Sequence, residues 1–546
     1  MLITEVLEKN AKFFPNEVSL VEINPAKRPS DHMTWKEFNL IEAAAGDKYR
    51  REMTWREFDV RANRFANLLL TRGVKKGDKV AILLMNCLEW LPIYFGILKS
   101  GALAVPMNYR YAADEIKYCA DLADVSVLVF GPEFTDRVQS VLPELNGIKN
   151  FFYVGGTDVP EFADDYARLS TYCSSNPPAV ELDEEDLAAI YFSSGTTGFP
   201  KAILHAHKAL INSCRTEQNH HGQKHDDTFL CIPPLYHTGA KMHWFGSLLS
   251  ASKAVLLRGV SPEWILQTVS EEKASIVWLL VPWAQDILDA IDRGDVKLSD
   301  YDLSRWRLMH IGAQPVPPSL IKRWKEVFPN HQYDTNYGLS ESIGPGCVHL
   351  GVENIRKVGA IGVPGYLWET KIVDERGKEI TEIEEVGELA VKGPGVMLCY
   401  YKNQKATDEI LKDGWLYTGD MAKRDAEGFI YLVDRKKDVI ITGGENLYPV
   451  QIEDFLRSCD LISDVAVIGL PHDRLGEIAA AIIQVKEGAV CTEEDIEKFC
   501  EALPRYKRPK KIIFADVPRN PTGKIEKPKL REKYCGMRLV EAQTCR

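Results

Sequence analysis

One stretch of the sequence has the composition of a phosphate-binding loop. An apolar run at residues 187–192 leads into Ser193-Ser-Gly-Thr-Thr-Gly-Phe-Pro-Lys201, in which six of the nine residues are Gly, Ser or Thr. Backbone amides and hydroxyls of such a loop can converge on phosphate oxygens, with Lys201 as a counter-charge. The spacing differs from the P-loop Gly-x-x-x-x-Gly-Lys-Ser/Thr, because Ala202 follows the lysine. A polar turn without a ligand is the alternative that local composition leaves open.

Six further blocks follow this loop along the chain. They are Ile311-Gly-Ala-Gln-Pro315, Asn336-Tyr-Gly-Leu-Ser-Glu341, Tyr417-Thr-Gly-Asp420, Asp434-Arg-Lys-Lys-Asp438, Gly443-Gly-Glu-Asn446 and Asn520-Pro-Thr-Gly-Lys524. Taken in order with the loop, they resemble the motifs of the adenylate-forming superfamily, which includes acyl- and aryl-CoA synthetases, luciferases and nonribosomal adenylation domains. The resemblance covers nearly the whole chain. It implies that a carboxylate is activated as an acyl-adenylate, whose AMP leaves when a thiol attacks.

The resemblance assigns a nucleotide site. It implies that Tyr337 stacks on adenine, that Asp420 and Arg435 bind the ribose, and that the Ser340 hydroxyl reaches the α-phosphate, where the family usually has Thr. Glu341 is expected to act in catalysis as the ligand of Mg²⁺, a hard ion that suits carboxylate and phosphate oxygens. The other expected nucleotide contacts are Ser193, Ser194, Gly195, Thr196, Thr197, Gly198 and Lys201 in the loop, and Gly312, Ala313, Gln314, Asn336 and Gly338.

The C-terminal blocks are expected to serve the two half-reactions in turn. By resemblance, the ammonium of Lys524 lies between the incoming carboxylate and the α-phosphate during adenylation. Gly443, Gly444 and Glu445 are expected to approach the acyl-adenylate when the thiol of coenzyme A attacks, and Lys437 corresponds to the hinge of this movement. Without the resemblance, Lys524 would be interpreted as a solvated charge and the hinge segment as an exposed linker.

The resemblance also indicates where the acid binds. His237, in Pro234-Leu-Tyr-His237, matches a histidine that gates the acyl site in many members and is expected to be catalytic; a capped loop histidine is the alternative. The expected pocket walls are residues 237–244, 281–283, 311–313 and 343–346. Trp244 and Trp283 are bulky and favour a flat or medium-length acyl group over a very long chain. Residues 443–449 resemble the fatty-acid and aromatic-acid branches.

Short apolar runs alternate with amphipathic stretches along the first 350 residues. Buried strands are predicted at 79–84, 103–106, 127–130, 190–192, 254–257, 276–280 and 308–311, with helices between them. This alternation is typical of α/β architecture with much parallel sheet. From residue 353 to 431 the chain is rich in Gly and short β patterns, which predicts a β-rich subdomain.

The last part of the chain has the pattern of a small α+β domain. Strands are predicted at 466–469, 481–485 and 511–514, and helices at 449–458 and 492–502. We place a boundary at the charged segment 434–438. An N-terminal adenylation domain over 1–434 is expected to carry the ATP and acid sites, and a mobile C-terminal domain over 435–546 to carry Lys524 and the CoA-side segment.

A short duplication lies near the N-terminus. Met33-Thr-Trp-Lys-Glu-Phe38 recurs as Met53-Thr-Trp-Arg-Glu-Phe58, and each copy contains the Thr-x-x-Glu capping box that predicts a helix start. The second copy is expected to begin a helix that continues to Leu70. The first copy resembles an insertion relative to the family, and its role stays open.

Overall composition excludes several classes of protein. The net charge of −11 gives no global basic field for nucleic acid, and no apolar run approaches the ~20 residues that span a bilayer. The 12 cysteines form no CxxC pair, which favours free thiols in a reducing compartment. The N-terminus lacks the apolar core of a signal peptide, so a cytoplasmic location is expected. The oligomeric state stays open, with a homodimer among the alternatives.

The expected function is that of an AMP-forming carboxylic acid:CoA ligase, an acid-thiol ligase that uses ATP, Mg²⁺ and coenzyme A. Its acid is expected to be a medium-to-long fatty acid or an aromatic or alicyclic acid. One alternative is an adenylation enzyme that passes the acyl group to a carrier protein or to a luciferase-like oxidation. Another is a non-catalytic nucleotide-binding protein. The absence of a carrier-domain serine signature argues against the first alternative, and the presence of all five expected site residues, Lys201, Glu341, Asp420, Arg435 and Lys524, argues against the second.

Overall fold

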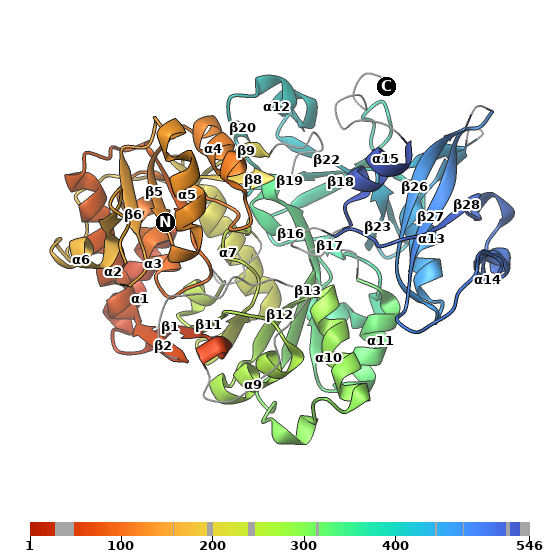
Figure 1. The fold of residues 1–546 in the computed structure, drawn as a ribbon, viewed down its shortest axis with the longest axis horizontal. Coiled ribbons are helices and arrows are strands. Elements are labelled where there is room, and N and C mark those ends of the chain that lie inside the picture. Colours follow the sequence, from red (N-terminus) through yellow and green to blue (C-terminus); the bar gives the residue numbers. More distant parts are fainter. Residues whose placement is uncertain are drawn as a thin grey trace.

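The computed structural model describes residues 1–27, 49–156, 158–193, 200–238, 246–312, 316–442, 445–472, 474–519 and 525–535. Two large sheets, two smaller antiparallel sheets and a C-terminal α+β unit make up the described part of the chain, which Figure 1 colours from red at the N-terminus to blue at the C-terminus. The two large sheets are interleaved in sequence, because residues 18–54 contribute two strands to the second sheet and residues 399–400 contribute one to the first. The predicted fold class is confirmed: a large N-terminal part of α/β and β-rich subdomains precedes a small C-terminal domain. Within the described ranges, every helix is too short or too polar to span a bilayer.

The first sheet has a parallel centre that is buried on both faces. Its spatial order is β20 (Cys399–Tyr400), β9 (Lys201–Ala206), β8 (Leu187–Ser193), β4 (Leu103–Pro106), β3 (Lys79–Leu83), β5 (Val125–Phe130), β6 (Asn150–Tyr153) and β7 (Asp164–Asp165). Strands β4, β3, β5 and β6 are parallel, whereas β8 and β9 form an antiparallel hairpin.

Helices cover both faces of this sheet, as alternation along β3 requires. Val80 and Ile82 belong to one apolar core, and Ala81 and Leu83 belong to another. The first core includes side chains of α2 (Trp55–Thr71) and α3 (Trp90–Lys99), and the second includes those of α4 (Ala113–Leu122) and α5 (Thr135–Val141). The short helix α6 (Tyr166–Thr171) packs beside α2.

The second large sheet is parallel except at one edge. Its order is β14 (Gln332–Asp334), β13 (Leu308–Gly312), β12 (Ile276–Leu280), β10 (Thr228–Cys231), β11 (Lys253–Leu257), β1 (Val18–Ile23) and β2 (Arg50–Thr54), and only β1 and β2 of these are antiparallel neighbours. An apolar core joins one face to α9 (Pro262–Glu272), α10 (Val281–Arg293) and α11 (Pro318–Val327).

Helix α7 (His207–His221) lies between the two large sheets, near the centre of Figure 1. Its Leu210 and Ile211 share one core with Ile82 of the first sheet and Leu256 of the second. Helix α1 (Ile3–Phe13) adds Leu7 to the same core. Helix α7, which follows the predicted phosphate loop, therefore packs against both large sheets.

The β-rich part follows the second sheet. Strands β15 (Asn336–Leu339), β16 (Gly344–His349) and β17 (Val363–Pro364) form one antiparallel sheet. A second antiparallel sheet has the order β18 (Glu369–Val373), β19 (Gly387–Lys392), β22 (Trp415–Arg424) and β21 (Leu411–Lys412), with β23 (Ile430–Arg435) also paired to β22 and α12 (Gln404–Ile410) packed beside it.

The C-terminal unit has its own sheet and core. Its strands are β24 (Ile440–Thr442), β25 (Glu445–Leu447), β26 (Ile462–His472), β27 (Gly476–Val485) and β28 (Lys511–Phe514), and its helices are α13 (Pro449–Arg457), α14 (Glu493–Phe499) and α15 (Lys527–Cys535). β23 pairs with β22, whereas β24 pairs with β27. The chain thus passes from one sheet to the next between Arg435 and Ile440, a stretch that overlaps the predicted charged segment 434–438. The division at 434/435 itself stays a prediction.

Two local predictions can be followed in the structure. Thr54, in the second copy of the duplicated hexapeptide, accepts a hydrogen bond from the Glu57 amide, and the Glu57 carboxylate accepts one from the Thr54 amide, so the capping box begins α2 as predicted. The first copy lies outside the described residues. Each cysteine of the described part is a free thiol.

Candidate active site

The two ends of the predicted phosphate loop meet in the hairpin of β8 and β9. Ser193 ends β8 and pairs with Lys201, which begins β9. The predicted phosphate contacts between them, Ser194, Gly195, Thr196, Thr197 and Gly198, lie outside the described residues. The hairpin therefore places a lysine at the base of the loop, where it can act as the expected counter-charge.

Lys201 and Glu341 both contact Tyr400, a residue that sequence reasoning missed. The Lys201 ammonium lies 4.7 Å from the centre of the Tyr400 ring. The Tyr400 hydroxyl donates a hydrogen bond of 2.7 Å to Glu341 Oε1. Burial and the adjacent Glu341 carboxylate raise the pKa of Tyr400, so the phenol keeps its proton at neutral pH. The sequence signal, a Tyr-Tyr pair after a Gly-rich stretch, is equally typical of core packing.

The backbone around Glu341 is held in an unusual conformation. Ile343, two residues on, is fully buried and has a φ of 63°, a left-handed value that a β-branched residue rarely adopts. The Ser340 carbonyl accepts a hydrogen bond of 2.8 Å from His205 Nε2, and the Glu341 carbonyl accepts one of 2.7 Å from the Met397 amide. Burial lowers the pKa of His205 to about 4, so its ring is neutral. Strain that the surroundings maintain in this way is typical of a functional site.

Three predicted nucleotide residues contact one another directly. The Tyr337 hydroxyl donates a hydrogen bond of 2.5 Å to Asp420 Oδ2, and Arg435 Nε lies 3.1 Å from Asp420 Oδ1. Asp420 and Arg435 are cross-strand partners on β22 and β23, and Tyr337 comes from β15. The Asp420 carboxylate raises the pKa of Arg435, and burial raises that of Tyr337. The arrangement fixes a buried carboxylate between a phenol and a guanidinium, as a ribose-binding acceptor requires.

A small-residue wall lies beside Asn336. A Cβ atom built on Gly312, at the end of β13, would lie 3.9 Å from the carbonyl oxygen and from Oδ1 of Asn336. The Asn336 side-chain amide donates a hydrogen bond of 3.0 Å to Glu217 Oε1 on α7. Gly338 pairs with Pro345 across the hairpin of β15 and β16. Ala313 and Gln314 lie outside the described residues.

The loop that carries His237 is fixed by another residue that sequence reasoning missed. Asn86, which is buried, donates a hydrogen bond of 3.0 Å to the Pro233 carbonyl and accepts one of 2.8 Å from the Leu235 amide. The His237 amide in turn donates to the Pro234 carbonyl, which closes a turn. Of the predicted pocket walls, 239–244 and 313 lie outside the described residues, and Trp283 and Ile343 are buried. Asn86 lies in a loop after a strand, and nothing in the sequence distinguishes it from an ordinary turn residue.

The predicted C-terminal site residues are only partly described. Lys437 is exposed in the segment between the two sheets, where the Lys436 amide donates to the Gly419 carbonyl at 2.9 Å and so holds the segment next to Asp420. Glu445 begins β25 and pairs with Thr442 through its backbone. Gly443, Gly444 and Lys524 lie outside the described residues, as does the side chain of Glu445.

Comparison with protein families identifies the family of the chain. The model of the AMP-binding enzyme family matches residues 24–401, and the model of the AMP-binding enzyme C-terminal domain matches residues 451–524. The chain belongs to the AMP-binding enzyme family. This confirms the expected superfamily and its two-part organisation.

Individual members of the AMP-binding family resemble the chain over most of its length. It is 32% identical over 475 residues to the long-chain-fatty-acid–CoA ligase FadD13 of Mycobacterium tuberculosis (strain ATCC 25618 / H37Rv), which covers 87% of this chain and 91% of the relative. A crystal structure of the anthranilate CoA ligase AuaEII in complex with anthranoyl-AMP has a TM-score of 0.84 and 26% identity, over 98% of this chain and 97% of the other. ATP-bound MatB from Rhodopseudomonas palustris has a TM-score of 0.84 and 25% identity, over 98% and 99%.

These findings confirm the expected reaction class of an AMP-forming acid:CoA ligase, and they support ATP binding by this member of the AMP-binding family. Within the described residues, the predicted site residues gather into two contact groups. Lys201 and Glu341 meet on Tyr400, and Tyr337 and Arg435 meet on Asp420. The role of each residue toward a ligand stays a prediction.

Proposed function

We propose that this AMP-binding enzyme is a carboxylic acid:CoA ligase that uses Mg²⁺-bound ATP and coenzyme A, with the residue roles described below. The observation that carries the proposal is the meeting of Lys201 and Glu341 on Tyr400, from β9, the turn after β15, and β20. A cation at the base of a Gly- and Thr-rich loop and a fixed carboxylate close by are what a polyphosphate and its counter-ion need.

In the first half-reaction, an oxygen of the substrate carboxylate attacks the α-phosphorus of ATP and the bond to pyrophosphate breaks. Both reactants are anions, so the protein has to position them and neutralise their charge. Lys201 and the loop hold the β- and γ-phosphates. The Tyr337 ring supports adenine, and Asp420 accepts hydrogen bonds from the ribose hydroxyls while Arg435 donates to the same sugar. Lys524 bridges the carboxylate and the α-phosphate.

The chemistry of the donor set fits magnesium. Glu341 supplies carboxylate oxygens, the hard donors that Mg²⁺ prefers alongside phosphate oxygens, and Tyr400 fixes the orientation of that carboxylate. When bound, Mg²⁺ neutralises charge on the phosphates. The part of Glu341 is to hold the ion at the nucleotide, and the part of Tyr400 is to hold Glu341.

In the second half-reaction, the thiol sulfur of coenzyme A loses its proton and attacks the acyl carbon, and the bond from that carbon to AMP breaks. We propose that the C-terminal domain turns about Lys437 between the two steps. One orientation brings in Lys524, and the other brings in Gly443, Gly444 and Glu445, where glycines allow the close backbone approach that a thiol path requires.

The acid is a medium-to-long fatty acid or an aromatic or alicyclic acid. The similarity to FadD13 and to AuaEII supports this range, because their names specify a long-chain fatty acid and anthranilate. Trp283, itself one of the predicted pocket walls, is buried at the start of α10, and bulk at this position favours flat or medium-length acids.

The test measures both half-reactions separately. The protein is incubated with ATP, Mg²⁺, coenzyme A and a panel of fatty, aromatic and alicyclic acids, and release of pyrophosphate and AMP and formation of thioester are followed. Lys524→Ala is expected to slow adenylation about a hundredfold or more while a supplied acyl-adenylate is still converted to thioester. Lys498→Ala, which removes an exposed lysine of the same domain, is the matched control and is expected to leave both steps unchanged.

Three results would overturn the proposal or part of it. Absence of acid-dependent pyrophosphate release with every acid would contradict the ligase activity. Adenylate formation without thioester would favour transfer to a carrier protein or an oxidative reaction. Equal loss of both half-reactions in Lys524→Ala would contradict the alternation of the C-terminal domain.

A further inference from the structure

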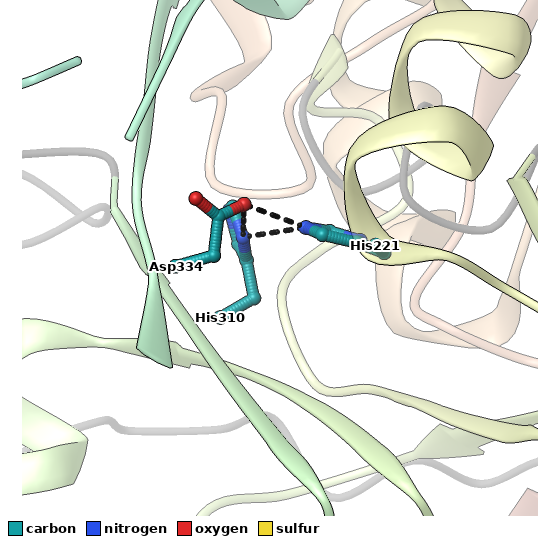
Figure 2. Close-up of side chains that lie close together, drawn as sticks. All are labelled: His221, His310 and Asp334. Carbon is teal, nitrogen blue, oxygen red and sulfur yellow. Dashed lines mark hydrogen bonds and ion pairs between the residues drawn. The ribbon is translucent and has the colours of Figure 1, made fainter. Parts of the chain in front are cut away.

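A cluster of ionisable side chains is buried outside the nucleotide contacts. His221 ends α7, His310 lies on β13 and Asp334 ends β14. Each of these side chains is fully buried. Figure 2 shows the ring nitrogen of His221 and a nitrogen of His310 directed at one oxygen of Asp334. Three segments that are distant in sequence therefore bring two imidazoles and a carboxylate to one point.

The three atoms are spaced as metal ligands are. His221 Nε2 lies 2.9 Å from His310 Nδ1 and 3.0 Å from Asp334 Oδ2, and His310 Nδ1 lies 3.4 Å from the same oxygen. Nitrogen and oxygen ligands bind Zn²⁺ at about 2.0–2.2 Å, which puts neighbouring ligand atoms of a tetrahedral site about 3.3 Å apart. The triangle of donor atoms is thus of the size that one such ion requires.

Hydrogen bonds do not make all three contacts of this triangle attractive. With Asp334 ionised, each nitrogen carries at most one proton, and one N–H of His221 can be shared between His310 Nδ1 and Asp334 Oδ2. If both nitrogens carry protons, the contact between them is repulsive. If only one does, the bare nitrogen faces the carboxylate oxygen. A cation at the centre makes all three lone pairs attractive at once.

The charge of the surroundings also favours a cation. Glu217, one turn before His221 on α7, is a second fully buried carboxylate, and His349 on β16 lies between the two. His349 Nδ1 is 3.2 Å from Asp334 Oδ2, and His349 Nε2 is 3.4 Å from Glu217 Oε1. The two carboxylates carry a charge of −2, and although burial opposes it, they raise the pKa of His349 to about 9, so a protonated His349 cancels one of these charges. A cation at the triangle compensates the negative charge that remains. Buried charge without such compensation is costly.

The ligand side chains have the supporting contacts that metal sites use. His221 Nδ1, the nitrogen away from the triangle, lies 3.8 Å from Glu217 Oε2. Asp334 Oδ1 accepts a hydrogen bond of 3.0 Å from the Gly351 amide, which leaves Oδ2 directed at the two imidazoles. The hydrogen bond on the second oxygen of Asp334 fixes the orientation of that ligand, and the Glu217 carboxylate lies beyond hydrogen-bond distance, where it acts on His221 through its charge.

We propose that His221, His310 and Asp334 bind one divalent transition-metal ion of the zinc class, at a buried site separate from the magnesium position at Glu341. Two imidazole nitrogens and one carboxylate oxygen suit zinc better than magnesium, which favours oxygen ligands. His349 orients the carboxylate from the other side, and a water molecule completes the coordination.

The ion has a positioning role behind the active site. It joins β13 two residues before Gly312, β14 two residues before Asn336, and α7, whose Glu217 accepts the hydrogen bond of the Asn336 side chain. These segments lead to the adenine and acid sides of the predicted site. Because the ligands are fully buried, the ion enters as the chain folds and does not exchange freely afterwards.

The experiment measures the metal directly, without ATP or a substrate acid. The full chain, freed of any affinity tag, is produced in zinc-supplemented medium, treated with a chelator, and analysed by elemental mass spectrometry. Close to one zinc per chain is expected to resist the chelator under native conditions and to be lost after unfolding. Refolding with Co²⁺ alone is expected to give the visible absorption of a tetrahedral or five-coordinate site.

Variants locate the ion. His310→Asn and Asp334→Asn are expected to lower the retained metal about tenfold or more. His331→Asn, which changes another buried histidine with its ring stacked on Phe328, is the matched control and should retain the ion. Folding of each variant is checked by circular dichroism, and the Co²⁺ spectrum of the unmodified chain decides the case if a variant does not fold. Zinc below about 0.1 per chain with no Co²⁺ absorption, or zinc retained equally in folded ligand variants, would overturn the site.

Discussion

Removing the hydroxyl of Tyr400 tests whether Glu341 needs to be held in place. Tyr400→Phe deletes the 2.7 Å hydrogen bond to Glu341 Oε1 but keeps the ring against which Lys201 packs at 4.7 Å. Burial raises the pKa of Tyr400, so the hydroxyl is protonated across the usual assay range and the effect should not depend on pH there. The variant therefore changes one contact in the site.

The size of the effect follows from the type of hydrogen bond. A hydrogen bond to a charged group contributes about 1.5–3 kcal/mol. If all of it is used to position Glu341 in the transition state for adenylation, kcat/KM for ATP falls about 10- to 100-fold, since each 1.4 kcal/mol is a factor of ten. Loss of orientation should lower kcat, whereas loss of nucleotide affinity alone should raise KM.

The neighbouring tyrosine provides a matched control. The Tyr401 hydroxyl also donates to a carboxylate, Asp124 Oδ2 at 2.9 Å, but this contact is at the surface. Tyr401→Phe should leave kcat/KM within about twofold, because surface hydrogen bonds and ion pairs contribute little. Pyrophosphate release at varied ATP concentration measures both variants. A Tyr400→Phe enzyme with unchanged kinetics, or an equal loss in both variants, would refute the reasoning.

Three further substitutions have expected outcomes. Asn86→Ala should raise KM for the acid several-fold and leave KM for ATP unchanged, because Asn86 fixes the histidine loop; equal changes in both would contradict this. Gly362→Ala would put a Cβ 1.8 Å from a backbone carbonyl oxygen of β16. In Gly377→Ala, the control, the atom nearest to the new Cβ is 3.8 Å away. Denaturant unfolding should therefore show Gly362→Ala to be less stable than the control by about 3 kcal/mol. Burial raises the pKa of Asp434 to about 6, so the folded state retains the carboxyl proton of Asp434 to a higher pH than the unfolded state does. The folded state therefore loses stability as pH rises from about 4 through 6. Asp434→Asn should remove that decline, about 2–3 kcal/mol in unfolding free energy between pH 4 and 7, and an unchanged decline would argue against it.

Local patterns predicted most of the architecture. The strands at 79–84 and 308–311 were recognisable because strands buried on both faces of a parallel sheet are mostly apolar, and β3 and β13 occupy those positions; Lys79 and His310 are the polar exceptions. The start of α2 was recognisable because a capping box is complete within four residues. The predicted nucleotide-binding residues were found by resemblance to a family, because the order of the motifs along the chain indicates the family even when no contact between residues is known.

What the sequence determined by itself is thus the set of elements, the family resemblance and the identity of the motif residues. Only the tertiary structure decided which other side chains contact the motif residues and fix their orientation. Tyr400 lies 59 residues from Glu341, Asn86 lies 147 residues from Pro233, and His221 lies 113 residues from Asp334. Such pairs share no period or spacing, because their contacts arise from how separate sheets pack around α7 and not from interactions along the chain. Tyrosine, asparagine and histidine are common in any protein and can have many roles. Only burial and contact with a partner distant in sequence show which role such a side chain has.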